Sequence, residues 1–127
     1  IESNTTVVGE VLDFNYNWYQ VCVSKHGHRH RIKIEVVPIS GVQSLSASDP
    51  DMYCSTDIVR PTLAHCTWIS AGLGTESIAL TSDHEDWDPE SSSMYIAVYG
   101  RSDAKYTLRV GIEVVPATTK LRRFSRA

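Results

Sequence analysis

The feature that most constrains the fold of this chain is a strand-type alternation of apolar and polar residues that recurs every 10 to 20 residues. Its clearest instance is residues 31–37, where Ile or Val at every second position alternates with Arg, Lys and Glu. Because successive side chains of a β-strand point to opposite faces of a sheet, this pattern is typical of a strand with one buried face. Apolar residues at helical spacing between helix caps are nearly absent. The sequence therefore predicts an all-β protein.

Eight short segments carry this pattern, separated by turns rich in Gly, Pro, Asp and Ser. They are residues 5–12, 18–24, 31–37, 52–55, 67–70, 77–80, 94–99 and 106–115. Since no helices lie between them, consecutive strands favour antiparallel over parallel pairing. We therefore expect a two-sheet antiparallel sandwich of about eight strands.

The length of 127 residues is that of one domain with a core large enough to need no cross-links. We assign residues 1–116 to the β-sandwich domain. Residues 117–127 lose the alternation and gather one Lys and three Arg, which indicates a basic linker or tail. The beginning Ile-Glu-Ser is an improbable native start, so we expect the chain to be part of a larger polypeptide or assembly.

Charge and hydropathy limit the classes of partner. The formal net charge is −3, so no overall positive field draws the chain to nucleic acid. No apolar run approaches the roughly 20 residues that a membrane span needs, so we expect no membrane insertion. A protein or a polysaccharide is the expected partner.

A family resemblance rests on short motifs that occur in a fixed order. They are Val7 to Gly9, Trp18-Tyr19-Gln20-Val21, Asp49-Pro50-Asp51-Met52-Tyr53, Glu76-Ser77-Ile78, Tyr95 to Gly100, and Tyr106-Thr107-Leu108-Arg109-Val110. This order resembles the bacterial-type pre-peptidase C-terminal domain, a jelly-roll β-sandwich appended to secreted enzymes and surface proteins. The resemblance implies a jelly-roll-like fold and a domain that binds or positions other molecules without catalysing a reaction. It also implies a core containing Tyr53, Trp68, Ile96, Val98, Tyr106 and Leu108.

The function implied by this resemblance is an accessory binding domain of a secreted or cell-surface protein. Its ligand would be a polysaccharide, a matrix protein or a neighbouring domain. Exposed aromatic rings provide contact area at low entropic cost, so the candidate binding residues are Tyr16, Trp18, Trp87 and Tyr99. Each of these four is equally compatible with a place in the core.

Acidic residues suggest a second possibility, a calcium-dependent adhesion or membrane module. Five carboxylates fall within residues 83–90, and Ca²⁺ prefers six to eight oxygen ligands. The candidate ligands are Asp49, Asp51, Asp83, Asp86 and Asp88. However, the spacing is not that of a calcium loop, and the calcium linker of some relatives of the resembled family is missing. Calcium is therefore possible but not favoured, and no other cofactor is expected.

Alternating histidines at positions 26, 28 and 30 raise the question of a zinc or copper site. In an extended segment these imidazoles would share one face. Lys25 and Arg29 would repel a cation there, and a solvated hairpin turn explains the segment equally well.

The three cysteines leave the compartment open. Cys54 and Cys66 lie at the two ends of one loop, and a disulfide between them would stabilise the fold by roughly 3 kcal/mol. Cys22 would then be left over, which is awkward outside the cell. The alternative is three reduced thiols in an architectural domain of a large intracellular assembly. Asn4-Thr5-Thr6 is a possible glycosylation site and favours secretion.

Catalytic motifs are missing from the sequence. It contains no Gly-x-Ser-x-Gly elbow, and His65 and Cys66 are sequence neighbours that would point to opposite faces of a strand. We therefore expect a protein that is not an enzyme.

Overall fold

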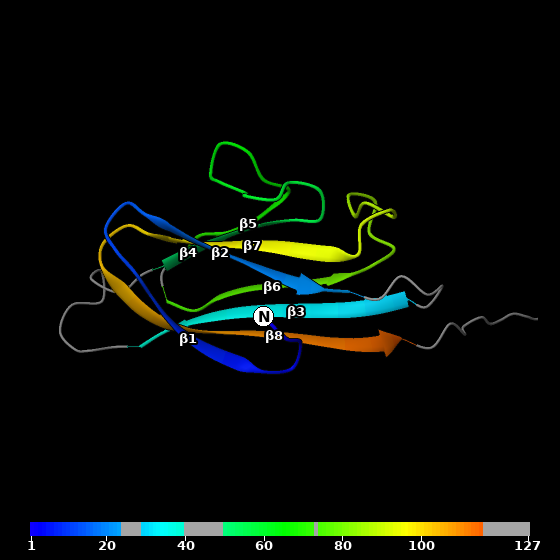
Figure 1. The fold of residues 1–127 in the computed structure, drawn as a ribbon, viewed down its shortest axis with the longest axis horizontal. Helices are drawn as coiled ribbons and strands as arrows, with labels where there is room; N and C mark the ends of the chain where they lie inside the picture. Colours follow the sequence, from blue (N-terminus) through cyan, green and yellow to red (C-terminus); the bar gives the residue numbers. More distant parts are fainter. Residues whose placement is uncertain (24–28, 40–49, 73, 116–127) are drawn as a thin grey trace, which may run out of the picture.

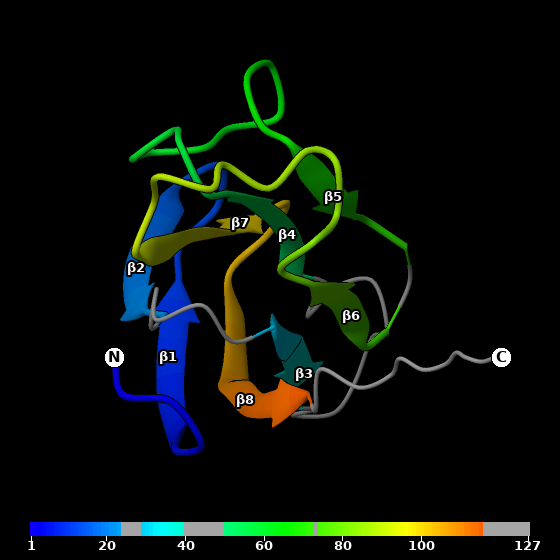
Figure 2. The ribbon, with the colours of Figure 1, turned by 90° about the vertical axis from the view of Figure 1, so that its right-hand side faces the viewer.

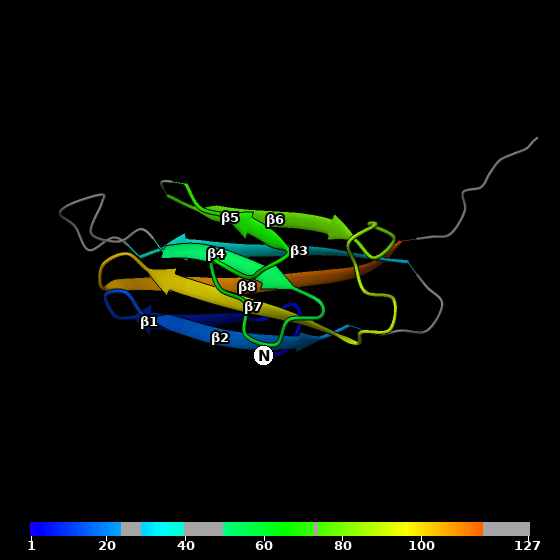
Figure 3. The same ribbon diagram turned by 90° about the horizontal axis from the view of Figure 1, so that it is seen from above.

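Two antiparallel sheets, stacked face to face, make up the part of the chain that the structure describes (Figures 1 and 3). The structure is a computed structural model, and it describes residues 1–23, 29–39, 50–72 and 74–115. The first sheet has the strand order β1-β8-β3-β6, and the second has the order β2-β7-β4-β5. No helix in these residues is long and apolar enough to cross a bilayer.

The eight predicted strands are all present, with ends that move by at most two residues. They are β1 (Thr6–Val11), β2 (Tyr16–Cys22), β3 (Arg29–Pro38), β4 (Pro50–Ser55), β5 (Trp68–Ser70), β6 (Glu76–Thr81), β7 (Ser93–Gly100) and β8 (Ala104–Val115). The predicted fold class, a two-sheet antiparallel sandwich of the jelly-roll type, is confirmed.

The chain passes from one sheet to the other at nearly every step. Only β4 and β5 are both consecutive in sequence and paired with each other. The first and last strands are neighbours, because β1 pairs with β8 from Thr6↔Arg109 to Val11↔Ala104. Such long-range pairing means that no single hairpin forms the fold, so the sheets depend on the core between them.

The core lies between the inner faces of the two sheets and follows the predicted alternation. Its fully buried side chains include Ile32, Ile34, Val36, Met94, Ile96, Val98, Tyr106, Leu108 and Val110. Burying one such aliphatic side chain contributes about 1.5–3 kcal/mol. The apolar face of each strand is therefore what aligns the two sheets.

Tyr106 links the two sheets through its hydroxyl group. This hydroxyl accepts a hydrogen bond of 2.9 Å from Asn17 Nδ2 and shares another with the Tyr19 hydroxyl, both on β2. The Tyr106 ring passes over Gly9, where a Cβ atom would lie 2.5 Å from the ring. Burial raises the pKa of the Tyr106 phenol well above its usual value. Gly9 is thus the residue that leaves room for this ring.

Two of the six residues expected between the sheets occupy other positions. Tyr53 is buried, but its neighbours in β4, Met52 and Cys54, are the ones that join the core cluster. Since side chains alternate along a strand, Tyr53 lies on the outer face of the second sheet. Trp68 is partly exposed and packs against the margin of the core.

Candidate functional site

Four aromatic rings gather on the outer face of the second sheet, the face turned away from the first sheet. They are Tyr16 and Trp18 of β2, Tyr53 of β4 and Tyr99 of β7, and we call them the aromatic face. Tyr16 stacks on Trp18, with the ring centroids 5.3 Å apart and the planes 10° from parallel. The centroid of Tyr16 also lies 4.7 Å from that of Tyr99 and 6.2 Å from that of Tyr53. Three of the four predicted binding aromatics are therefore brought together.

The strand register explains this grouping. Trp18 and Tyr53 both lie opposite Ala97 of the central strand β7, one on each side. Likewise, Tyr99 lies opposite Tyr16 on one side and Asp51 on the other. The small side chain of Ala97 leaves space that the larger rings on the flanking strands fill.

Residues 56–67 connect β4 to β5 and lie on the outer side of the second sheet, so we call them the covering loop (Figure 2). Trp18 Nε1 donates a hydrogen bond of 3.0 Å to the Pro61 carbonyl oxygen, and the Leu63 amide donates one of 3.2 Å to the Tyr16 hydroxyl. The guanidinium carbon of Arg60 lies 5.0 Å from the centroid of a Trp18 ring, within the range of a cation–π contact. The aromatic face thus anchors the covering loop to the sheet.

The loop is also held at its two ends. Ser55 Oγ accepts hydrogen bonds from the amides of Asp57 and Ile58 at the loop start and contacts Thr67 Oγ1 at its end. Near the tip, Thr62 and His65 exchange backbone hydrogen bonds of 2.9 and 3.0 Å. The loop is therefore a built part of the domain.

An ion pair between a buried carboxylate and an exposed guanidinium group borders the aromatic face. Asp51 is 1% exposed, and its Oδ2 accepts a hydrogen bond of 3.0 Å from Nε of Arg101, whose side chain reaches solvent. Burial, together with the nearby Asp51 charge, raises the pKa of Tyr53 to about 12. Asp51 therefore has a structural partner in Arg101.

The exposed surface on and beside the covering loop is mostly apolar and carries the Arg60 cation. Trp18 of β2 is 38% exposed, and Val59 and Leu63 of the loop and Ile69 of β5 are more exposed still. We call these four residues together with Arg60 the loop surface. Apolar, aromatic and Arg side chains are those that carry most binding energy in protein interfaces.

Trp87, the fourth predicted binding aromatic, does not join this surface. It is 7% exposed and belongs to the core cluster, with its ring centroid 6.3 Å from that of Trp68. The turn around it is tight, because the Trp87 amide bonds to the His84 carbonyl and the Asp88 amide to Thr56 Oγ1. The acidic segment thus folds back and turns its one aromatic residue inward.

The predicted calcium ligands are not brought together in the described residues. No group of three or more His, Cys, Asp or Glu side chains there is arranged to hold a metal ion. Asp83 accepts hydrogen bonds from Thr81 and Arg29, which lower the pKa of its carboxyl group. Asp86 and Asp88 lie with it in the turn before β7, while Asp51 is on β4. Asp49 lies outside the described residues.

The structure does not contain the predicted disulfide, and all three cysteines are free thiols in it. Cys54 lies opposite Trp68, not opposite Cys66, and its side chain points into the core. Burial, and secondarily the nearby Cys66, raises the pKa of Cys54 far above its usual value. Cys22 is exposed on β2.

Two further sequence motifs have a plain structural place. His30 is buried on β3, and its amide donates to Ser82 Oγ, whereas His26 and His28 lie outside the described residues. Asn4, the possible glycosylation site, is exposed and adopts a φ of 63°.

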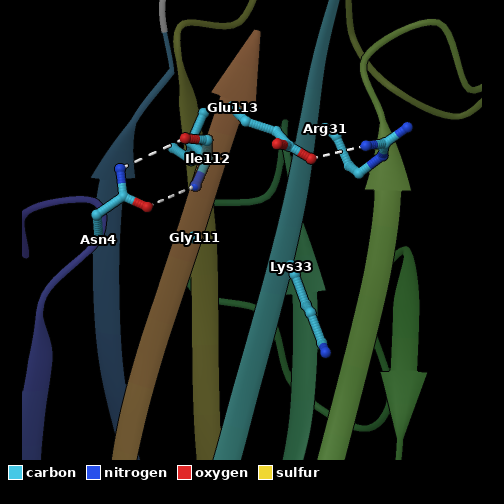
Figure 4. Close-up of a pocket in the computed structure, with 6 residues that line it drawn as sticks. All are labelled: Asn4, Arg31, Lys33, Gly111, Ile112 and Glu113. Atoms are coloured by element: carbon cyan, nitrogen blue, oxygen red, sulfur yellow. Dashed lines mark hydrogen bonds and ion pairs between the residues drawn. The ribbon is translucent and has the colours of Figure 1, made fainter. Parts of the chain in front are cut away.

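Asn4 borders a hollow on the outer face of the first sheet (Figure 4). Its Oδ1 accepts a hydrogen bond from the Ile112 amide, and its Nδ2 donates one to the Ile112 carbonyl. Gly111 forms the floor, and an Arg31–Glu113 ion pair of 2.6 Å closes one side (Figure 4). Asn4 therefore extends the hydrogen bonding of β8 to residues that precede the start of β1.

The covering loop and Tyr53 are the parts of the site that sequence reasoning missed. The strand β4 is buried on both faces, so the polar–apolar alternation that would have assigned Tyr53 to the outer face is lost. A signal did exist, because Asp51, Tyr53 and Ser55 share one parity while Met52 and Cys54 share the other.

Comparison with known proteins gives a match in structure alone. No family profile matches the sequence, and no curated protein does. Among solved structures, the chain is similar to the pre-peptidase C-terminal domain of a collagenase from Bacillus anthracis. The TM-score is 0.59 and the identity 17%, over 87% of this chain and 90% of that one. The chain has the pre-peptidase C-terminal domain fold.

A second structure with a similar fold is PliG from Aeromonas hydrophila, a periplasmic inhibitor of g-type lysozyme. Its TM-score is 0.56 and its identity 16%, over 86% of this chain and 85% of that one. This chain is thus similar in fold both to a domain of a collagenase and to a lysozyme inhibitor. At these identities the likeness concerns the fold alone.

Proposed function

We propose that this chain is a non-catalytic accessory domain that binds a protein partner, or a neighbouring domain of its parent protein, through the loop surface. The observation that carries the proposal is the composition of that surface. Arg60 lies over Trp18, the side chains of Val59, Leu63 and Ile69 are exposed and apolar, and hydrogen bonds anchor the covering loop to the sheet. A pre-organised loop loses little conformational entropy on binding, so little of the binding free energy is needed to order it.

A polysaccharide is the less favoured ligand. Sugar rings stack on open faces of aromatic side chains, but Tyr16 stacks on Trp18, and Arg60 lies against the same side chain. The Trp18 Nε1 hydrogen is also already donated to Pro61. Binding a sugar here would require the covering loop to move.

The compartment that we propose is secreted or cell-surface. Support comes from the two similar structures, one a domain of a collagenase and the other a periplasmic protein. The domain would act there as part of a larger protein, holding that protein against its partner.

The test uses a photo-crosslinking residue in place of Leu63 in the parent protein, with the same residue in place of Ala79 as the matched control. Ala79 is exposed on the outer face of the first sheet. We expect Leu63 to crosslink one protein or domain. The purified partner should then bind the Val59→Ser/Leu63→Ser variant at least about tenfold more weakly than the unaltered chain. Equal binding by both would overturn the proposal.

The polysaccharide alternative has its own measurement. Affinity electrophoresis through gels containing plant, bacterial or animal polysaccharides should show no retardation of the domain. Retardation that Trp18→Ala abolishes would replace the protein partner by a sugar.

A second candidate, an architectural domain of an intracellular assembly, is favoured by the three free thiols. Alkylation of protein from its native source, under denaturing and non-reducing conditions, separates the two compartments. Three labelled cysteines support the intracellular candidate, and a blocked Cys22 or Cys66 supports the secreted one.

A further inference from the structure

Exposed large apolar side chains of the described residues gather in two separate places. Of ten such side chains, four belong to the loop surface on the second sheet. Five others lie at one end of the first sheet, namely Val8, Leu12, Phe14, Val37 and Ile39, and we call them the end patch. The tenth, Val114, belongs to neither.

The register brings Val8, Val37 and Ile39 of the end patch together on the outer face of the first sheet. Val8 of β1 and Val37 of β3 both lie opposite Thr107 of β8, so they flank it on the outer face. The Ile39 amide donates a hydrogen bond to the carbonyl oxygen of Lys105, which lies two residues from Thr107 on β8. Leu12 and Phe14 follow β1 directly, in the turn that leads to β2.

Phe14 is the most unusual residue of the end patch. It has a φ of 58°, a conformation that bulky side chains rarely adopt, and its side chain is 69% exposed. Because the ring faces solvent, packing in the core does not compensate for the energetic cost of this backbone conformation. An outlier of this kind at a loop tip points to a binding role.

The turn that carries Phe14 is held rigidly by backbone hydrogen bonds. The Phe14 amide donates 2.7 Å to the Gly100 carbonyl, and the Gly100 amide donates 3.1 Å to the Asn15 carbonyl. The Asp13 amide donates 2.8 Å to Asp103 Oδ1. Gly100 permits this packing, since a Cβ there would lie 2.9 Å from the Leu12 carbonyl oxygen. The backbone that carries the ring is therefore held in a fixed position.

The charges around the two surfaces are complementary. Three exposed carboxylates lie beside the end patch, those of Glu10, Asp13 and Asp103, and none forms an ion pair within the described residues. The positive charge of Lys105 balances only one of these three negative charges. The loop surface presents the Arg60 guanidinium group. Two end patches facing each other would bring like charges together, whereas an end patch facing a loop surface would not.

We propose that the end patch of one molecule binds the loop surface of a second copy of this chain. Phe14 would pack against Val59 and Leu63, and the acidic groups would face Arg60. The inference rests on the proposed function, which makes the loop surface a binding surface, and it names the partner as another sandwich of the same kind. Because the two surfaces differ, the contact is head-to-tail and leaves one surface of each kind free at the ends.

Sedimentation velocity tests the proposal with two variants that each block one surface. Leu12→Ser/Phe14→Asn blocks the end patch, and Asn tolerates the positive φ of position 14. Val59→Ser/Leu63→Ser blocks the loop surface. Between about 10 μM and about 1 mM, the unaltered chain should show a rising average sedimentation coefficient that falls when salt is added. Each variant alone should stay monomeric.

Mixing the two variants gives the decisive result. Each keeps the surface that the other lacks, so an equimolar mixture should form a dimer and nothing larger. Val114→Ser, which removes an exposed apolar side chain outside both surfaces, should associate like the unaltered chain. Thermal melts of all variants check that the fold is kept.

The outcomes separate this inference from the proposed function. A chain that stays monomeric throughout, or a mixture that does not dimerise, overturns the head-to-tail contact. If Val59→Ser/Leu63→Ser still weakens crosslinked-partner binding, the proposed function stands without it. Self-association that survives Val59→Ser/Leu63→Ser would also overturn the head-to-tail contact, because that variant lacks one of the two surfaces.

Discussion

Tyr53 illustrates how a single residue can be buried without belonging to the core. It is 2% exposed, yet it lies under the covering loop and against Tyr16 and Tyr99 on the outer face of the second sheet. Its phenol sits near the buried carboxylate of Asp51, so ionising it would place two negative charges close together in a poorly solvated region.

This environment predicts a specific loss of stability at high pH. In the unfolded chain a tyrosine has a pKa of about 10. In the folded chain burial raises the pKa of Tyr53 to about 12. The stabilising difference is therefore complete below pH 10 and is lost as the pH rises toward 12. Urea unfolding across this range should show a smaller loss for Tyr53→Phe than for the unaltered chain. Identical pH profiles would place Tyr53 in a solvated site.

At the scale of elements, the strands could be predicted because their signal is local. Alternation within residues 31–37 or 106–115 identifies a strand without reference to the rest of the chain. The position of the covering loop could not be predicted in this way. It depends on the contact between Trp18 and Pro61, two residues 43 positions apart, which no local pattern encodes.

Contacts between elements also explain which predicted site residues came together. Tyr16, Trp18 and Tyr99 share a face because the register of β2 on β7 aligns them. Trp87 has no strand parity to guide it, since it lies in a turn, and its inward position follows from packing against Trp68. Strand residues of a candidate site are thus more predictable than loop residues.

The contact between Tyr106 of β8 and Gly9 of the neighbouring strand β1 gives a prediction at this scale. Gly9→Ala would place a methyl carbon about where the Tyr106 ring now lies, 2.5 Å from its nearest atom. The ring would have to move and would lose its hydrogen bond with Asn17. We expect a destabilisation of about 2–4 kcal/mol by chemical denaturation, because overpacking and a lost buried hydrogen bond both contribute.

A comparison variant separates these two contributions. Gly9→Ala combined with Tyr106→Leu should be less destabilised than the sum of the two single changes, because the ring that causes the clash is gone. Strict additivity would show that Gly9 and Tyr106 do not constrain each other.

At the scale of the whole molecule, the effect of calcium on the melting temperature tests whether the acidic turn before β7 stabilises the fold by binding this ion. A ligand that binds only the folded state at a hundred times its Kd raises stability by about 2.7 kcal/mol. Millimolar calcium acting on a micromolar site would thus raise the melting temperature by several degrees.

We expect a shift near zero, unchanged in the Asp86→Asn/Asp88→Asn variant. The carboxylate of Asp83 in the same turn already accepts hydrogen bonds from Thr81 and Arg29, and the described residues contain no cluster of three metal-ligating side chains. Differential scanning calorimetry with calcium or with a chelator measures the shift. A rise that the two substitutions remove would favour the calcium-dependent adhesion module.

The pairing of the first strand with the last has a mechanical consequence. Because β1 and β8 are antiparallel, the start of β1 at Thr6 lies beside Arg109, only a few residues before β8 ends at Val115. A force that pulls on Thr6 and Val115 therefore acts at one end of this pair. The hydrogen bonds between the strands would open one after another, from Thr6 toward Val11, as in a zipper. In a larger protein under tension, this domain should therefore unfold gradually and at low force.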